Sequence, residues 1–156
     1  MSNIEITLNT LETKERKKAI KKAKSIVYLC DNAGEIVLDK LFIKQLPKKI
    51  VTAVVRGFPA INDAVMDDAD QVGLGDVAKV ITNGSRAPGT LISDCSKGFL
   101  KTLNSADCII SKGQGNFESL NQTDLPIFFL FKVKCESLAN VVGKSIGTHM
   151  LVNNKA

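Results

Sequence analysis

Residues 26–35, Ile-Val-Tyr-Leu-Cys-Asp-Asn-Ala-Gly-Glu, pass from an apolar run directly into a polar turn. Such a run, followed by turn formers and by a helical pattern from Ile36, is typical of a buried parallel strand. Ligands of open α/β sheets bind at the carboxyl edge, where strands end and helices begin. Asp31 and Asn32 are expected at that edge, and a carboxylate beside an amide oxygen suits a divalent cation. The sequence therefore predicts a metal site at the end of this strand.

The rest of the chain repeats the alternation of apolar strands with helical segments. Further strands are expected over 50–55, 78–82, 107–111, 126–131 and 148–152, and helices over 36–46, 64–69, 91–103, 117–120 and 134–142. This order predicts an α/β protein, a three-layer α/β/α Rossmann-like sandwich with a mostly parallel sheet. Because no linker or repeat interrupts it, residues 1–156 are interpreted as one domain. That domain comprises a basic N-terminal helical segment, 1–24, and a metal- and phosphate-binding core, 25–156.

Composition excludes several classes of protein. With 44% hydrophobic and 24% charged residues among 156, the chain has the make-up of a soluble globular domain large enough to bury a core. No apolar run approaches the roughly 20 residues that a membrane span needs. The first residues lack the charged-then-apolar order of a signal peptide, so we expect a cytoplasmic protein without membrane contact.

Cysteine and histidine offer little material for catalysis or metal binding. The four cysteines form no C-x-x-C pair, and they are interpreted as reduced structural thiols rather than as a zinc or disulfide site. Because the sequence has a single histidine, His149, it does not favour a histidine-rich metal site or a Ser-His-Asp triad. We interpret His149 as incidental.

The net charge of +5 comes largely from one segment, since seven of the 21 lysines and arginines lie between Lys14 and Lys24. Ala19, Ile20 and Ala23 form a narrow apolar stripe there, at helical spacing. No aromatic residue is interleaved with the lysines, so a stacking platform for nucleic-acid bases is absent. A solvated helix face is favoured, and a nucleic-acid partner is the most distant alternative.

Four expected strands end in polar, glycine-containing loops, which should all lie on one edge of the sheet. In chain order these loops contribute Asp31, Asn32 and Glu35; Arg56, Asn62 and Asp63; Asn83 and Ser85; and Lys112, Gln114 and Asn116. Each loop alone is explained by an ordinary turn. Together, carboxylates beside arginine and lysine indicate an anionic ligand held next to a metal.

The loop 112–116, Lys-Gly-Gln-Gly-Asn, suits a phosphate group. Gly113 and Gly115 let backbone N–H groups approach an oxyanion, and the following helix offers its positive end. Lys112 adds a positive charge on a flexible side chain, and Arg56 is suited to bidentate hydrogen bonding with phosphate oxygens. The loop is neither a Walker A motif nor G-x-G-x-x-G, so the standard nucleotide-binding modes are not supported.

These interpretations have structural alternatives. A tight strand-to-helix turn also explains the loop 112–116, and an ion pair on the surface explains Arg56. Asp63 is equally placed to cap a helix, because Asn62-Asp63 precedes a helical stretch. Glu35 either orients a water near the metal or places a negative charge at a helix N-terminus.

The loop sequences resemble the motifs of the metal-dependent damage-control phosphatases, long catalogued as domain of unknown function eighty-nine. The matching segments are Asp-Asn-Ala-Gly-Glu at 31–35, Arg-Gly-x-Pro-x-x-Asn-Asp at 56–63 and Lys-Gly-Gln-Gly-Asn-Phe-Glu at 112–118. The segment 83–90 is also similar to the prokaryotic branch. The resemblance runs from about Ser25 to the C-terminus and implies an α/β/α fold.

The resemblance also implies a reaction, the hydrolysis of small phosphate monoesters such as sugar phosphates or damaged metabolites by a metal-activated water. One divalent cation (manganese, nickel, cobalt or magnesium) would be held by Asp31, Asn32 and Asp63, the catalytic residues. Either Asp31 or Glu35 would orient the water. From the resemblance and the four loops together, we expect the substrate to contact Glu35, Arg56, Asn62, Asn83, Ser85, Lys112, Gly113, Gly115 and Asn116.

Members of that family usually carry a helical region before the first motif, which helps to roof the site. Only about two dozen residues precede the first strand here, so we expect either a minimal form or a roof from a homo-oligomer or a second chain. The expected partner is a small phosphorylated metabolite. The alternative function is a non-catalytic Rossmann-like module that binds a phosphorylated metabolite or nucleotide.

Overall fold

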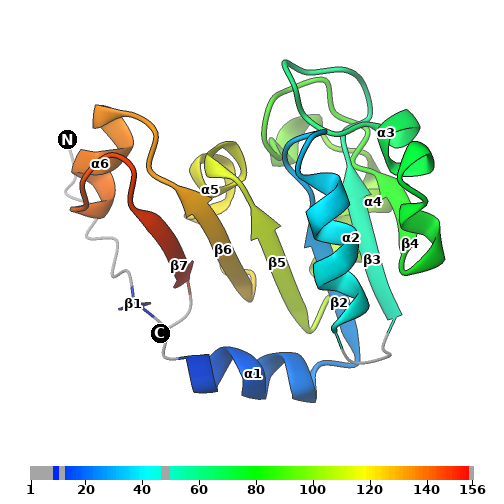
Figure 1. Ribbon diagram of the computed structural model, residues 1–156, viewed down its shortest axis with the longest axis horizontal. Helices are drawn as coiled ribbons and strands as arrows, with labels where there is room; N and C mark the ends of the chain where they lie inside the picture. Colours follow the sequence, from blue (N-terminus) through cyan, green and yellow to red (C-terminus); the bar gives the residue numbers. More distant parts are fainter. Residues whose placement is uncertain (1–8, 11–12, 47–49, 155–156) are drawn as a thin grey trace.

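A seven-stranded sheet forms the centre of the protein (Figure 1). The computed structural model describes residues 9–10, 13–46 and 50–154. The strands are β1 (Asn9–Thr10), β2 (Ser25–Leu29), β3 (Ile50–Val55), β4 (Lys79–Thr82), β5 (Cys108–Lys112), β6 (Ile127–Lys132) and β7 (His149–Asn153), in the order β1-β7-β6-β5-β2-β3-β4. The neighbours from β6 to β4 pair in parallel, whereas β7 runs antiparallel to both β6 and β1. The prediction of a mostly parallel sheet is confirmed.

Helices fill the connections between the strands. They are α1 (Thr13–Lys22), α2 (Ile36–Lys44), α3 (Met66–Gln71), α4 (Lys97–Asn104), α5 (Gln114–Leu120) and α6 (Glu136–Val142), with two 3-10 turns, η1 (Leu74–Asp76) and η2 (Ile92–Asp94). The basic helix α1 lies along the amino-terminal edge of the sheet, away from the carboxyl ends of the strands (Figure 1). None of the helices in the described ranges is long and apolar enough to cross a bilayer.

Two helix predictions need correction. The helix expected over 64–69 begins only at Met66, because the preceding residues pair with the loop after β2, where Ala64 N donates to Asp31 O. The helix expected over 91–103 is divided into η2 and α4. Ser96 separates them, since its hydroxyl accepts from the backbone N–H of Phe99 and caps α4.

Two hydrophobic cores lie on opposite faces of the sheet and make the fold three-layered. One face of β2, β5 and β6 packs against α4, α5 and α6 through Val27, Leu29, Ile109, Phe129, Leu103, Phe117 and Leu138. The other face packs against α2 and α3 through Ile26, Tyr28, Ile110, Phe128, Ile36, Ile43 and Ala69. All four cysteines are free, and burial raises the pKa of Cys108 to about 11, as expected of a structural thiol.

The connections change side between β2 and β5, which are neighbours at the centre of the sheet. The chain leaves β2 through α2 on one face, and it leaves β5 through α5 on the other (Figure 1). Two helices that diverge in this way open a crevice at the carboxyl ends of the strands, where α/β proteins place their ligands. The loop beginning at Asp31 and the loop beginning at Gly113 both lie at this switch point.

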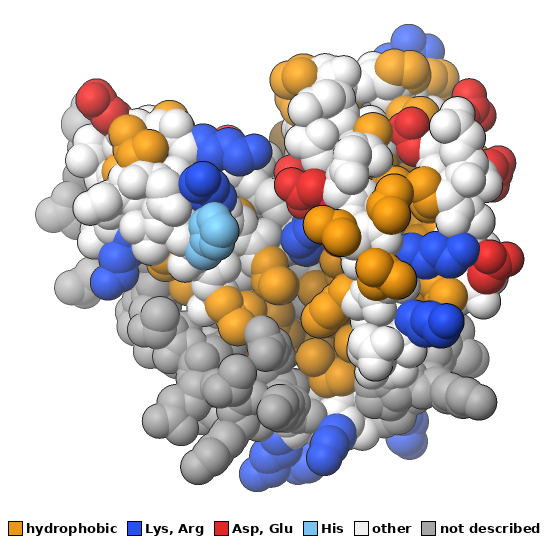
Figure 2. Space-filling view, in the orientation of Figure 1, with side chains coloured by type: hydrophobic (Ala, Val, Ile, Leu, Met, Phe, Trp, Pro, Cys, Tyr) orange, Lys and Arg blue, Asp and Glu red, His pale blue; other side chains and the backbone are white. Residues whose placement is uncertain are grey.

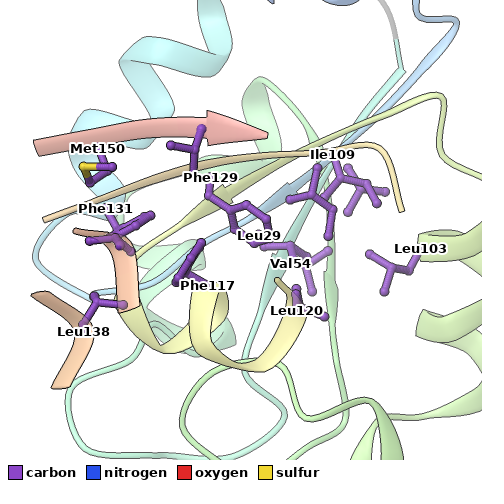
Figure 3. Packing of buried hydrophobic residues seen from close by; sticks show 14 of the residues in the cluster. Leu29, Val54, Leu103, Ile109, Phe117, Leu120, Phe129, Phe131, Leu138 and Met150 are labelled. Carbon is purple, nitrogen blue, oxygen red and sulfur yellow. The ribbon is translucent and has the colours of Figure 1, made fainter. Parts of the chain in front are cut away.

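Phe117 anchors α5, and with it one side of the crevice, to the sheet (Figure 3). Its ring stacks on Phe131 at a centroid distance of 4.4 Å and meets the edge of Phe129 at 5.2 Å. The side chain is 1% exposed. An aromatic residue enclosed in this way fixes the helix through dispersion contacts and through burial of its ring.

We therefore expect Phe117→Ala to lower the free energy of unfolding by about 3–5 kcal/mol, the usual effect of emptying a buried aromatic site. Ile146→Ala is the matched control, because Ile146 is 54% exposed, and it should change stability by less than about 0.5 kcal/mol. Urea denaturation followed by circular dichroism measures both values. Equal midpoints for the two variants would contradict the packing role of Phe117.

Candidate active site at the carboxyl edge of the sheet

Backbone hydrogen bonds join the loops that follow β2 and β3. Ala64 N donates to Asp31 O at 2.7 Å, and Ala33 N donates to Asn62 O at 2.9 Å. Asn32 and Asp63 therefore form an isolated antiparallel bridge. The three residues expected to bind a metal are thus brought together by main-chain pairing. The helix-cap alternative for Asp63 is wrong, because the N-cap of α3 is Val65.

The loop after β5 touches Asp31 from the other side of the switch point. Gly113 has a φ of 85°, in the region that favours glycine, and a Cβ atom at this position would overlap the Asp31 carboxylate. The glycine expected to expose backbone N–H groups thus also makes room for the side chain of Asp31.

The carboxylates of Asp31 and Asp63 repel each other in a partly buried place. Burial raises the pKa of Asp31 to about 6, and the negative charge of Asp63 adds to that shift. Arg56 and Lys134 oppose it through their positive charges. Two nearby carboxylates that lack bulk solvent are an unfavourable pair unless a cation lies between or beside them.

The donor atoms fit a hard divalent cation. Asp31 and Asp63 offer carboxylate oxygens and Asn32 an amide oxygen, the ligand types that magnesium and manganese prefer. Arg56 and the backbone N–H of Gly89 both donate to Oδ2 of Asp63, which leaves Oδ1 for another ligand. In the described ranges no group of three or more His, Cys, Asp and Glu side chains is placed to hold a metal. A metal bound to Asp31 and Asp63 would therefore need the amide of Asn32, or another oxygen ligand, beside them.

Arg56 is buried, with only 1% of its surface exposed. Its Nε donates to Asp63 Oδ2 at 2.6 Å, its Nη1 to Thr90 Oγ1 at 3.2 Å and its Nη2 to Asn116 Oδ1 at 3.0 Å. The alternative of a surface ion pair is wrong. With these three partners the guanidinium orients Asp63, and contact with a substrate phosphate stays a prediction.

Asn116 is the second hub of the site. Its Oδ1 accepts from Arg56 and from the hydroxyl of Thr90, while its Nδ2 donates to the carbonyls of Cys30 and Lys112. This one amide connects β2, β5 and the loop before η2. Thr90 was not singled out as a site residue from the sequence, although it ends the 83–90 segment, because its role depends on a partner 26 residues away.

Asn83 and Ser85 are fully buried and shape the loop after β4. Asn83 Oδ1 accepts from the N–H groups of Gly57 and Ser85, and Ser85 Oγ donates to Asp94 Oδ2. A Cβ atom on Gly57 would lie 2.6 Å from the backbone of Gly84. The polar side chains thus hold two chain segments in close approach.

Lys112 points toward α2 and is paired with two carboxylates. Its Nζ lies 2.9 Å from Glu35 Oε2 and 2.9 Å from Asp39 Oδ1, and Tyr28 OH donates to the same Asp39 oxygen at 2.6 Å. Burial opposes the charge of Lys112, yet Asp39 and Glu35 raise its pKa above the ordinary value. Asp39 is 2% exposed. Its role was not predicted from the sequence, although a carboxylate on the buried face of α2, between Ile36 and Ile43, indicates a buried charge that needs a partner.

A cavity of about 280 Å³ opens beside Asp31. Its lining comprises Asp31, Glu35, Lys112, Gly113, Gln114, Leu130, Phe131, Lys132, Lys134, His149 and Met150. Figure 2 shows this face hollowed, with lysine or arginine side chains and the histidine on one side and acidic side chains on the other. His149, interpreted as incidental, lines the cavity.

Several of the expected substrate contacts do not line this cavity, which extends from Asp31 toward β6 and β7. Asn62 is exposed and contributes its backbone carbonyl to the pairing with Ala33. Gly115 accepts from the hydroxyl of Ser119 through its carbonyl. The other expected substrate contacts outside the lining are Arg56, Asn83, Ser85 and Asn116. Of the three expected metal ligands, Asn32 and Asp63 also lie outside it.

Comparison with known proteins identifies the family. The family model of the damage-control phosphatase ARMT1-like domain matches residues 2–150. Damage-control phosphatase PH1575 of Pyrococcus horikoshii is 38% identical over 149 residues, which cover 92% of this chain and 52% of that protein. A damage-control phosphatase of Archaeoglobus fulgidus is 40% identical over 137 residues, covering 85% of this chain and 47% of that protein.

A solved structure agrees with these sequence matches. The crystal structure of PH1575, described as a DUF89 family protein, has a TM-score of 0.88 and 35% identity, covering 97% of this chain and 54% of that one. The chain therefore spans about half the length of the relatives that it matches. The motifs, the fold and the matched range agree, and the chain belongs to the damage-control phosphatase ARMT1-like family.

Proposed function

We propose that the protein is a metal-dependent phosphatase that hydrolyses small phosphate monoesters, such as sugar phosphates or related damaged metabolites. The observation that carries this proposal is the bridge between Asn32 and Asp63, which brings two carboxylates and an amide together at the switch point of the sheet. The names of two relatives as damage-control phosphatases support the reaction class.

Asp31, Asn32 and Asp63 would hold one divalent cation, manganese, nickel, cobalt or magnesium. A cation bound there supplies Lewis-acid polarisation of the phosphoryl group and lowers the pKa of a water. Arg56 keeps Asp63 in one orientation through its 2.6 Å hydrogen bond to Oδ2. Asp31 and Glu35 are the two carboxylates in the cavity lining, which supports either of them as the group that would accept a proton from the attacking water.

A cavity of this size limits the substrate. About 280 Å³ lies just below the roughly 300–1,000 Å³ of typical ligand pockets, and this suits a small metabolite rather than a nucleotide-sized ligand. Leu130, Phe131 and Met150 provide an apolar part of the lining against which the carbon skeleton of the substrate packs.

The first test is a panel of sugar phosphates assayed with manganese, cobalt, nickel or magnesium. We expect turnover that chelation abolishes. Asp31→Asn and Asp63→Asn should lower kcat/KM by at least about 100-fold, because changes to residues that only support the metal ligands already cost about 10- to 100-fold. Asp67→Asn, at an exposed position of α3, is the control and should retain activity. Metal titration by calorimetry should show the same loss of affinity in the two site variants.

Two outcomes would revise this proposal. Metal and phosphate binding without turnover across the panel would identify a binding module instead of an enzyme. Unchanged metal affinity in Asp63→Asn would show that the ligand set is wrong.

A second test concerns the contact between Gly113 and Asp31. Gly113→Ala places a Cβ atom on the Asp31 carboxylate, so it should displace that side chain and lower metal affinity by about 10-fold or more. Gly147→Ala is the matched control, since Gly147 also has a positive φ, 91°, and nothing lies within 4 Å of its Cβ position.

Both glycine variants should lose stability from the strained backbone, about 1–2 kcal/mol each. Only Gly113→Ala should also lose metal affinity. Thermal melts with and without manganese separate the two effects, because ligand stabilisation should survive in Gly147→Ala. Equal stabilisation of both variants by manganese would show that the position of Asp31 does not depend on Gly113.

A further inference from the structure

One partner of Lys112 is a buried carboxylate that lies outside the cavity lining. Asp39 is 2% exposed and sits on the face of α2 that packs against the sheet, between Ile36 and Ile43. Lys112 Nζ and Tyr28 OH both donate to Asp39 Oδ1, at 2.9 Å and 2.6 Å. Within the described ranges Asp39 Oδ2 has no hydrogen-bond partner. Both polar contacts of this carboxylate therefore meet at a single oxygen.

Fold stability alone does not account for a carboxylate at this position. Removing an ion from water is costly, and apolar side chains that replace a buried ion pair are often neutral or stabilising. Ile36 and Ile43 already pack α2 against the sheet, and a third apolar residue between them would extend that contact. We therefore consider what Asp39 holds in place.

Tyr28 fixes the position of Asp39. Burial, and then the negative charge of Asp39, raise the pKa of Tyr28 above its ordinary value, so the hydroxyl keeps its proton and donates. The side chain of Tyr28 is 1% exposed, and its ring lies beside that of Phe42 at a centroid distance of 6.0 Å. Because Tyr28 belongs to β2 and Asp39 to α2, their hydrogen bond joins the helix to the strand.

Lys112 connects this buried pair to the cavity. Its Nζ lies 2.9 Å from Glu35 Oε2, and Lys112, Glu35 and Asp31 all line the cavity. Burial opposes the charge of Lys112, and Asp39 is the largest of the causes that raise its pKa. The side chain of Glu35 is 44% exposed, and among the described residues only Lys112 donates a hydrogen bond to its carboxylate. The orientation of Glu35 thus depends on Lys112.

From this arrangement we infer that Asp39, held by Tyr28, is a positioning residue that acts through Lys112 to keep the carboxylate of Glu35 in the cavity beside Asp31. The inference rests on the proposed function and deepens it, because it selects Glu35 as the group that accepts the proton of the attacking water. That proton passes to Glu35 as the water oxygen bonds to phosphorus. It then passes to the ester oxygen as the bond between that oxygen and phosphorus breaks.

The first test follows the position of Lys112 without any turnover. Reductive methylation of the folded protein, quantified by mass spectrometry, gives a reaction rate for each lysine. Asp39→Asn should make Lys112 react about 10-fold faster, because the ammonium group loses a charge-assisted hydrogen bond. Tyr28→Phe should accelerate it less. Lys101, at an exposed position of α4, is the internal control and should react at the wild-type rate in every variant.

Kinetics with manganese, on the best substrate of the panel, test whether Asp39 acts through Glu35. Glu35→Gln should lower kcat by about 100-fold, as loss of a proton acceptor does. Asp39→Asn should lower kcat by about 10-fold and change KM by less than about twofold, because it affects the chemical step. In a protein that already carries Glu35→Gln, Asp39→Asn should change kcat by less than about twofold, since the group that it positions is gone.

Ile43→Val is the matched control for a change on the buried face of α2. Ile43 is 2% exposed and lies one turn after Asp39. This variant should lose stability while kcat, KM and the methylation rate of Lys112 stay at their wild-type values. If Ile43→Val lowers kcat as much as Asp39→Asn does, a general loosening of α2 explains both variants and the inference is overturned.

The outcomes distinguish this inference from the proposed function. Faster methylation of Lys112 in Asp39→Asn, with no ester hydrolysed by the wild type, supports positioning by Asp39 and contradicts the enzyme. Hydrolysis by the wild type with an unchanged methylation rate of Lys112 in Asp39→Asn supports the enzyme and overturns the inference. An equal loss of kcat from Asp39→Asn with and without Glu35→Gln, or a rise in KM at unchanged kcat, overturns the inference as well.

Discussion

The rest of the site depends on the hydrogen bonds of one buried group, the guanidinium of Arg56. A buried charge is tolerated only with partners, and removal of one partner from such a group typically costs about 3–5 kcal/mol. Its partners come from three separate segments, at Asp63, Thr90 and Asn116. Since Asn116 also bonds to the carbonyls of Cys30 and Lys112, the loops at four strand ends are held by one connected set of hydrogen bonds.

This network explains how separate loops can hold the candidate metal ligands close together. Backbone pairing brings Asn32 to Asp63, Arg56 fixes one oxygen of Asp63, and Gly113 leaves space for Asp31. Each of these constraints acts on a different atom of the candidate ligand set. The carboxylates therefore stay close together although they repel each other, and the repulsion favours any cation that enters.

The sequence predicted the part of the site that is local. A buried strand followed by Asp-Asn, and a second followed by Arg-Gly and Asn-Asp, placed the candidate ligands on one edge, because parallel strands share their carboxyl ends. The partners of Arg56 could not be predicted, since Thr90 and Asn116 lie 34 and 60 residues away. His149 was passed over for a related reason. The antiparallel return of β7 beside β6 is a property of the whole sheet, and no local periodicity in residues 149–153 reveals it.

Because β7 pairs with β6, the residues around the cavity come from two separate stretches of the chain. The candidate metal ligands and the network around Arg56 lie between Asp31 and Asn116, whereas Lys132, Lys134 and His149 of the cavity lining come later in the chain. A substitution in the second stretch changes the charge of the cavity lining without touching the candidate metal ligands. The two groups of residues can therefore be substituted independently of each other.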